Sequence, residues 1–276
     1  MSQLHGDLNS FGLVVIGAHT QKGTTEEIQA TARSRGVTFT VVSSASVKDG
    51  QDFNGIPHCM VFDHAGQCIY RGSPEGAEAS ARKAVGIALV EDVGKSTFSK
   101  PLMPLVESLK KGQSPKTILQ KVLPLQRSPD ANAASEAKQL VTSLSKTGQK
   151  QIEAAEVIKK EDPYAAYVSL QKVPLTFKGT PVETKANAVL AELRRNKVVA
   201  VELQAHASFD KIKKWDTALS AAAGKVDPKG PEFQRAFRST LKQMQTTLQQ
   251  MKRSWPDSKA TREAIEIGEK YAVMVP

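Results

Sequence analysis

Few side chains in this chain of 276 residues could do covalent or metal chemistry, and their spacing completes no site. The two cysteines, Cys59 and Cys68, lack the C-x-x-C or Cys/His spacing of a zinc site and are too few for a disulfide framework. The histidines form no HExxH motif and no pair four residues apart. They are His5, His19, His58, His64 and His206. We therefore expect neither a metal site nor a bound cofactor.

Cys59 is the thiol to consider as a nucleophile. It stands in a run that we expect to form a strand covered on both faces, where burial keeps a thiol protonated and unreactive. Cys68 falls on the strand that returns beside it, in a register that does not set the two cysteines opposite each other. The sequence thus favours a quiet core cysteine and predicts no disulfide.

Charge divides the chain into two parts. The 38 Lys and Arg exceed the 28 Asp and Glu, which gives a net charge of +10. Residues 1–92 hold 7 basic and 10 acidic residues, whereas residues 93–276 hold 31 and 18. The second part therefore favours acidic partners, which include nucleic acid, anionic lipid and acidic proteins.

Composition excludes two classes of protein. An apolar content of 40% is too high for a disordered chain. No apolar run approaches the roughly 18 residues that a membrane helix needs. No basic segment followed by an apolar stretch opens the chain, so no signal peptide is predicted either.

Residues 1–92 alternate short apolar runs with one helical pattern. Thr24 and Glu27 form a capping box that opens a helix from Thr25 to Ser34, and Gly36 ends it. The β-branched run Leu13–Ile16 before this helix reads as a strand buried on both faces. Further elements are expected at 37–42, 58–62, 67–71 and 74–89, with a bulged turn at 63–66. The expected order is β-α-β-β-β-α, beginning with a right-handed parallel crossover.

Residues 11–90 resemble the thioredoxin-like thiol-disulfide oxidoreductases and peroxiredoxin relatives. The resemblance rests on Gly55–Gly72, in which a glycine, an apolar residue and a proline precede a hairpin with an Asp-x-x-Gly turn. It implies a central mixed sheet flanked by helices and a cis peptide before Pro57. The family carries its C-x-x-C where this chain reads Gly17–Thr25, which contains no cysteine. Because a thiolate is the attacking group in disulfide exchange, we expect this fold without the redox chemistry.

The resemblance also implies a groove for an extended peptide beside Pro57. Its candidate residues are His19, Thr20, Ile56, Pro57 and His58. His19 and His58 would meet at the proline loop, where a pair of imidazoles binds an anion or responds to pH, unless they are ordinary surface or capping histidines.

Residues 93–276 form an all-helical region, joined to the first part by a linker at 91–104. Alanine, leucine, lysine and glutamine dominate, and prolines separate the helices. We expect helices at 104–111, 115–125, 133–145, 149–160, 164–173, 182–195, 198–207, 212–223, 232–254 and 259–271.

A weak internal repeat runs through this helical region. The segments 128–137, 177–186 and 255–264 each place a turn before a helix that has alanine at a close-packing position. This pattern resembles tetratricopeptide-like helical hairpins, which offer surfaces for partners, although capping alone also produces it. An irregular helical bundle is the alternative.

Basic clusters flank both tryptophans, in 211–215 and 252–255. Charge next to an aromatic ring is typical of single-stranded nucleic-acid binding, but both rings also fall where a helix turns its apolar face inward. The sequence favours the second interpretation.

The sequence leaves three alternative functions. The first is a non-catalytic thioredoxin-like scaffold (residues 1–92) fused to an all-helical, possibly tetratricopeptide-like, interaction domain (residues 93–276), with a protein partner. The second is a thiol-disulfide oxidoreductase or peroxidase that uses Cys59. The third is a basic binder of nucleic acid or of an anionic surface. The resemblance implies an extracytoplasmic protein, periplasmic or secreted, whose signal peptide has been removed or omitted.

Overall fold

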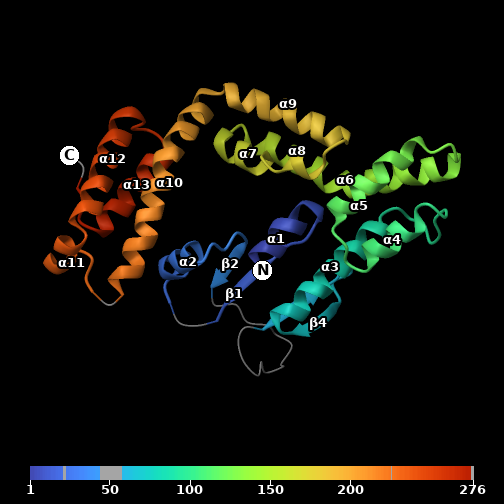
Figure 1. Cartoon of the computed structure of the whole chain (residues 1–276), viewed down its shortest axis with the longest axis horizontal. Coiled ribbons are helices and arrows are strands. Elements are labelled where there is room, and N and C mark those ends of the chain that lie inside the picture. Colours follow the sequence, from blue (N-terminus) through green and yellow to red (C-terminus); the bar gives the residue numbers. More distant parts are fainter. Residues whose placement is uncertain (21–22, 44–57, 225, 275–276) are drawn as a thin grey trace. The chain divides into compact units, whose positions relative to one another are not determined.

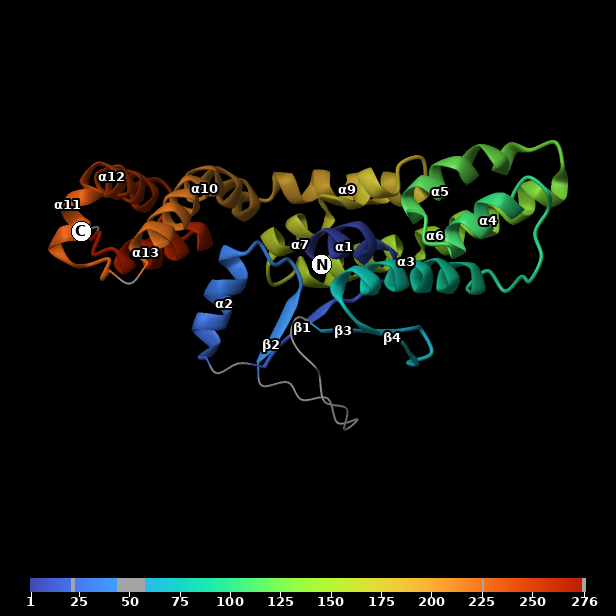
Figure 2. The ribbon, with the colours of Figure 1, turned by 60° about the horizontal axis from the view of Figure 1, so that its bottom comes forward.

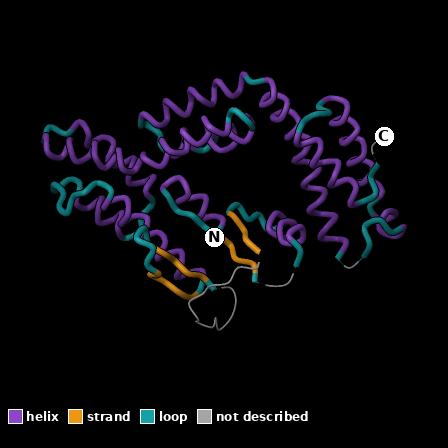
Figure 3. Tube along the Cα trace, turned by 180° about the vertical axis from the view of Figure 1, so that it is seen from behind, coloured by secondary structure: helices purple, strands orange, loops and turns teal. Residues whose placement is uncertain are grey.

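The computed structural model describes residues 1–20, 23–43, 58–224 and 226–274. They form two compact units: residues 1–155 with 169–188, and residues 156–168 with 189–276. Within the described ranges, strands occur only among residues 16–72, and helices dominate elsewhere (Figure 3). The predicted domain boundary at residue 92 does not coincide with this division. Whether residues 1–92 fold alone therefore stays a prediction.

The first unit begins with the elements α1 (Ser2–Leu8), η1 (Asn9–Phe11), β1 (Ile16–His19), α2 (Thr25–Ser34), β2 (Thr40–Ser43), β3 (Cys59–Phe62), β4 (Cys68–Gly72) and α3 (Pro74–Glu91) (Figure 1). It continues with α4 (Met103–Lys110), α5 (Pro115–Val122), η2 (Leu123–Arg127), α6 (Ala131–Ile158) and α8 (Val173–Thr176). The second unit contains most of α7 (Pro163–Leu170) and all of α10 (Lys197–Ala223), α11 (Pro231–Ala236), α12 (Arg238–Ser254) and α13 (Lys259–Lys270). Helix α9 (Pro181–Arg195) belongs to both units.

The strands form two pairs. β1 and β2 are parallel, whereas β3 and β4 are antiparallel, with a bulge between Val61 and Phe62. Across the view of Figure 2 they follow one another in the order β2, β1, β3, β4. The predicted succession of strands and helices is therefore present, but no continuous central sheet joins the two pairs in the described residues.

Local signals in the sequence form as expected. The Thr24 amide donates to the Glu27 carboxylate at 2.8 Å, and the Glu27 amide donates to the Thr24 hydroxyl at 3.2 Å, which completes the capping box of α2. Gly36 has a φ of +64°, and the Val37 amide closes the helix end on the Ala32 carbonyl at 2.9 Å. Asp63 Oδ1 accepts the amides of Ala65 and Gln67 and so fixes the hairpin turn.

The first strand differs from its prediction. It begins at Ile16, whose side chain is 61% exposed, and Val14 before it is 76% exposed. The expectation of a strand buried on both faces is therefore wrong. A short apolar run shows only that the residues suit a strand, and whether another element covers it depends on the rest of the fold.

Several helices are longer or shorter than expected. The predicted helices 133–145 and 149–160 are one helix, α6, which continues through Gly148. Gly148 packs closely on another element, since a Cβ there would lie 2.5 Å from the Phe177 ring. The predicted helices 198–207 and 212–223 likewise form the single helix α10. Conversely, predicted 232–254 divides into α11 and α12, and predicted 164–173 ends at Leu170 before α8.

The core of the second unit is built from α10, α12 and α13. Helix α10 packs on both of the others. Ile212, Met244, Leu248 and Met251 are all 0% exposed, and Ala264 of the sequence repeat is equally buried. The equivalent alanines of the other two repeats, Ala137 and Ala186, are also 0% exposed, so the close-packing role predicted for them is confirmed.

Candidate functional site

The predicted peptide groove is described only in part. His19 ends β1 and is half-buried, and Thr20 follows it and is exposed. His58 directly precedes β3 and is half-buried. Ile56 and Pro57 lie outside the described residues. The structure thus places three of the five groove residues at strand ends, and the prediction that His19 and His58 meet stays a prediction.

The start of α2, where a redox cysteine would stand in the resembled family, is occupied by its own cap. The Glu27 carboxylate and the Thr24 hydroxyl lie at this end and accept the first backbone amides. A carboxylate here opposes the formation of a second negative charge, such as a thiolate, at the helix start. The local electrostatics are those of a capped structural helix.

Cys59 and Cys68 are both free and half-buried, so the expectation that the strand of Cys59 is covered on both faces is wrong. They are not cross-strand partners, since Cys59 pairs with Gly72 and Cys68 with Phe62, which confirms the predicted register. Burial raises the pKa of the Cys59 thiol, and the positive amino terminus opposes this only in part. The thiol therefore stays protonated near neutral pH, as expected for a structural cysteine.

Four large apolar side chains on the two strand pairs are exposed to solvent. Ile16 and Val42 share a side of the parallel pair and are 61% and 39% exposed. On the hairpin, Phe62 and Ile69 are 54% and 46% exposed. Helix α3 packs against β3 and β4, as Figure 2 shows, and Phe62 lines a cleft together with residues of α3. We call Ile16, Val42, Phe62 and Ile69 the open strand face. Sequence reasoning missed it because it expected the strands that hold Ile16 and Phe62 to be covered on both faces.

A cleft of about 470 Å³ lies in the first unit between the segment 11–14, strand β3, α3 and α6. Alanines and Val85 of α3 line it, and Asp92 and Lys146 lie at its polar end. The Lys146 ammonium, hydrogen-bonded to Asp92, lowers the pKa of that carboxyl despite its partial burial. The Ser143 hydroxyl donates to the Leu89 carbonyl at 2.6 Å. Asp92, Lys146 and Ser143 are thus held in structural hydrogen bonds at this end of the cleft.

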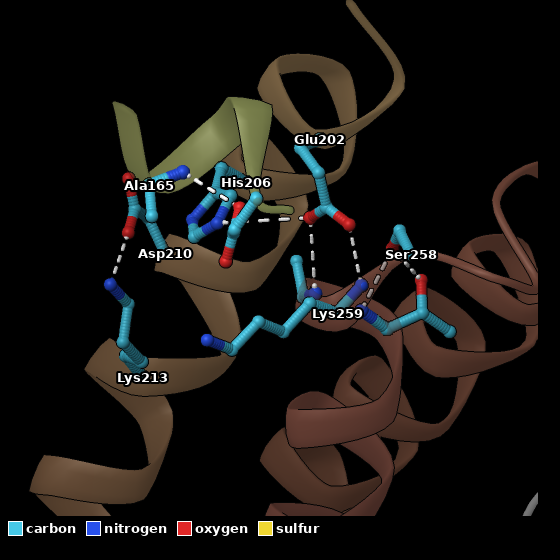
Figure 4. A network of polar contacts seen from close by, with 10 residues as sticks. Ala165, Glu202, His206, Asp210, Lys213, Ser258 and Lys259 are labelled. Atoms are coloured by element: carbon cyan, nitrogen blue, oxygen red, sulfur yellow. Dashed lines mark hydrogen bonds and ion pairs between the residues drawn. The ribbon is translucent and has the colours of Figure 1, made fainter. Parts of the chain in front are cut away.

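The second unit contains a buried polar network around Glu202, shown in Figure 4. The Glu202 side chain is 5% exposed and accepts the backbone amides of Lys259 at 2.5 Å and Ala260 at 3.2 Å. Ser258 caps the same helix start by accepting the Thr261 amide at 3.0 Å. A carboxylate at the amino end of α13 stabilises the helix dipole.

His206 lies beside this network. Its ring stacks on Tyr164 with centroids 4.7 Å apart, and its Nε2 lies 4.0 Å from the Glu202 carboxylate. Burial lowers the pKa of His206, while Glu202 raises it and Lys213 lowers it further. Burial also raises the pKa of Tyr164 to about 12. Carboxylate, imidazole and phenol thus serve packing and capping in this network.

The two tryptophans pack inward. Trp215 and Trp255 are partly buried against the core of the second unit, and the Trp255 indole donates to Gln204 Oε1 at 3.2 Å. This is the packing role that the sequence favoured over base stacking.

Three further findings bear on function. Among the described residues, no three His, Cys, Asp or Glu side chains are grouped closely enough to hold a metal ion. None of the helices in the described ranges is both long and apolar enough to cross a bilayer. No protein-family model, curated protein or solved structure matches the chain.

Proposed function

We propose that this chain is a non-catalytic binding protein that takes up an extended segment of a partner protein on the strand pairs of its first unit. The observation that carries the proposal is the open strand face. Exposed apolar side chains that form one patch mark interaction sites, and we propose that these four side chains form such a patch. An extended segment with apolar residues at every second position would cover them, because such a segment presents alternate side chains to one face.

The strand pairs also leave hydrogen-bonding edges. In the described residues β1 pairs only with β2, and β3 only with β4. A two-stranded sheet is marginally stable by itself, and an added strand supplies backbone hydrogen bonds as well as side-chain contacts. By the resemblance to the thioredoxin-like fold, His19, Thr20, Ile56, Pro57 and His58 would extend the same surface.

The test is a selection of displayed random peptides on the full chain, followed by affinity measurements on a double variant, Ile16→Ser with Phe62→Ser. We expect selected peptides with alternating apolar residues and a loss of at least about tenfold in affinity, since two buried apolar contacts contribute at least about 1.4 kcal/mol. The matched control is Val157→Ser with Leu175→Ser, because these helical side chains are equally exposed at 70% and 68%. Equal losses in both variants would show that the open strand face is not the site.

Thiol chemistry at Cys59 is the competing function. It predicts rapid alkylation of Cys59 at neutral pH and insulin reduction or peroxide turnover that disappears in Cys59→Ser. The raised pKa of Cys59 favours slow alkylation and no turnover in either protein. Turnover lost in the variant would replace the binding proposal with an enzyme.

A further inference from the structure

The positive charge of the chain is concentrated in two segments that contain no acidic residue. Residues 108–129 and 233–256 each hold five Lys or Arg and no Asp or Glu. Without these ten cations, 28 basic residues remain against 28 acidic ones. The net charge of +10 is therefore equal to the charge of these two segments.

Helix α12 occupies most of the second segment, and its apolar side chains are buried while its charged side chains are exposed. Its apolar residues Leu241, Met244, Leu248 and Met251 are 5% exposed or less and belong to the core. At ~100° per residue, the exposed side chains of Arg238, Lys242, Gln245, Gln249, Lys252 and Arg253 fall on one arc of about 100°. We call these six side chains the α12 basic arc.

Two lysines of the second unit outside this arc are paired with carboxylates. Lys213 pairs with Asp210 at 2.6 Å, and Lys270 pairs with Asp216 at 2.8 Å. Helix α12 itself carries no carboxylate. Within the described residues, Arg238, Lys242 and Arg253 form no ion pair with a carboxylate.

From these observations we infer that the α12 basic arc binds the phosphate backbone of a nucleic acid. Arg, Lys and Gln side chains donate to phosphate oxygens, and the arc presents four cations and Gln249 for this, while Gln245 Nε2 donates to the Met274 carbonyl at 3.2 Å. Arg238 and Arg253 are separated by about 22 Å along the helix, which matches about six phosphates of one duplex strand. A helix also fits the DNA major groove, which is about 12 Å wide.

The arc favours nucleic acid over a membrane. A helix that lies in a bilayer interface inserts an apolar face between the lipids. The apolar face of α12 is already buried in the protein core, and its exposed side chains are all polar or charged. Binding through this arc would therefore rest on charge and hydrogen bonds alone, without sequence preference.

The experiment measures binding of the full chain to a labelled DNA duplex between about 50 and 200 mM salt, with duplex RNA and single-stranded DNA as further probes. The variant carries Arg238→Gln, Lys242→Gln and Arg253→Gln. The control carries Lys100→Gln, Lys172→Gln and Lys178→Gln, which removes the same charge from exposed lysines outside both acid-free segments. Arg238→Lys with Arg253→Lys keeps the charge of the arc.

We expect the slope of log K against log salt to become shallower by about 2 to 3 in the α12 variant, since each lost phosphate contact removes about 0.9. Affinity at low salt should fall by at least about tenfold, while the control and the charge-retaining variant stay within about threefold. Unchanged thermal unfolding shows that each variant is folded. Equal losses in the α12 variant and the control would overturn the inference. So would α12-dependent binding to phosphatidylserine vesicles without binding to nucleic acid.

Discussion

Apolar side chains are buried in the helical core of the second unit but exposed on the strand pairs of the first unit. In the second unit, Ile212 is fully buried among α10, α12 and α13, together with the large side chains that surround it. On the strands, Ile16 is 61% exposed although it has the same side chain. The difference teaches that the helical core is complete within the chain, whereas the strand pairs leave surface that a partner could cover.

The largest expected difference comes from the same substitution at these two isoleucines. Ile212→Ala leaves a cavity in a packed core and should lower the free energy of unfolding by about 2 to 5 kcal/mol. Ile16→Ala should lower it by less than about 1 kcal/mol, because that side chain is already mostly in water. Urea unfolding of both variants measures this. Similar losses would show that the open strand face is covered in solution, for example by self-association.

A second substitution tests the polar part of the helical core. Glu202→Ala leaves the amides of Lys259 and Ala260 without their acceptor, so we expect a loss of about 2 to 3 kcal/mol. The control is Glu192→Ala, because its carboxylate is 65% exposed and pairs with a surface lysine, Lys159. Glu192→Ala should lower the free energy of unfolding by less than about 1 kcal/mol. Equal stability of the two variants in urea unfolding would mean that water replaces Glu202 at the start of α13.

A third prediction concerns the packing of helix α6. Gly148→Ala forces the Phe177 ring to move and should cost about 1 to 3 kcal/mol. Phe177→Leu in the same chain should recover part of that loss, because the smaller side chain leaves room for the new methyl group. Thermal unfolding of the single and double variants measures the coupling between them. Additive losses would show that the two residues do not touch.

The smallest predicted effect is the pH dependence of stability, which differs between the two units. The lowered pKa of His206 means that the unfolded state takes up a proton first, so the second unit loses stability as pH falls below about 6.5. In the first unit, the Ser99 amide, donating to the carboxylate at 2.8 Å, lowers the pKa of Glu136. Stability from Glu136 is present above the ordinary pKa of about 4.3 and is lost only at lower pH.

Two variants assign these pH effects. His206→Gln should abolish the loss between about pH 7 and 5.5, and Glu136→Gln should reduce the loss below about pH 4.3. Thermal unfolding across this range measures both. A wild-type profile that is flat above about pH 5 would contradict the role of His206.

Much of the local structure could be predicted from the sequence. The capping box of α2, the stop at Gly36 and the turn at Asp63 depend on side chains within a few residues of the backbone groups that they satisfy. Such signals act before any tertiary contact forms, so they can be recognised without the fold. The register that separates Cys59 from Cys68 follows from the same turn.

The candidate sites could be predicted only in part. The sequence showed that the segment 17–25 contains no cysteine and that the second half is basic. It did not show that Ile16 and Phe62 would be exposed, nor that Arg238, Lys242 and Arg253 would lie on one exposed arc. Exposure and ion pairing depend on which distant elements cover a residue, and a single sequence does not contain that information.

What the sequence alone determined is the succession of elements and the two acid-free segments, because capping, periodicity and charge are local properties. Only the tertiary structure decided that Gly148 lies within a continuous helix and that Glu202 caps a helix 57 residues further along the chain. It also decided which strand surface stays open. The physical reason is that close packing and burial are set by pairs of residues far apart in the sequence, which meet only when the chain has folded.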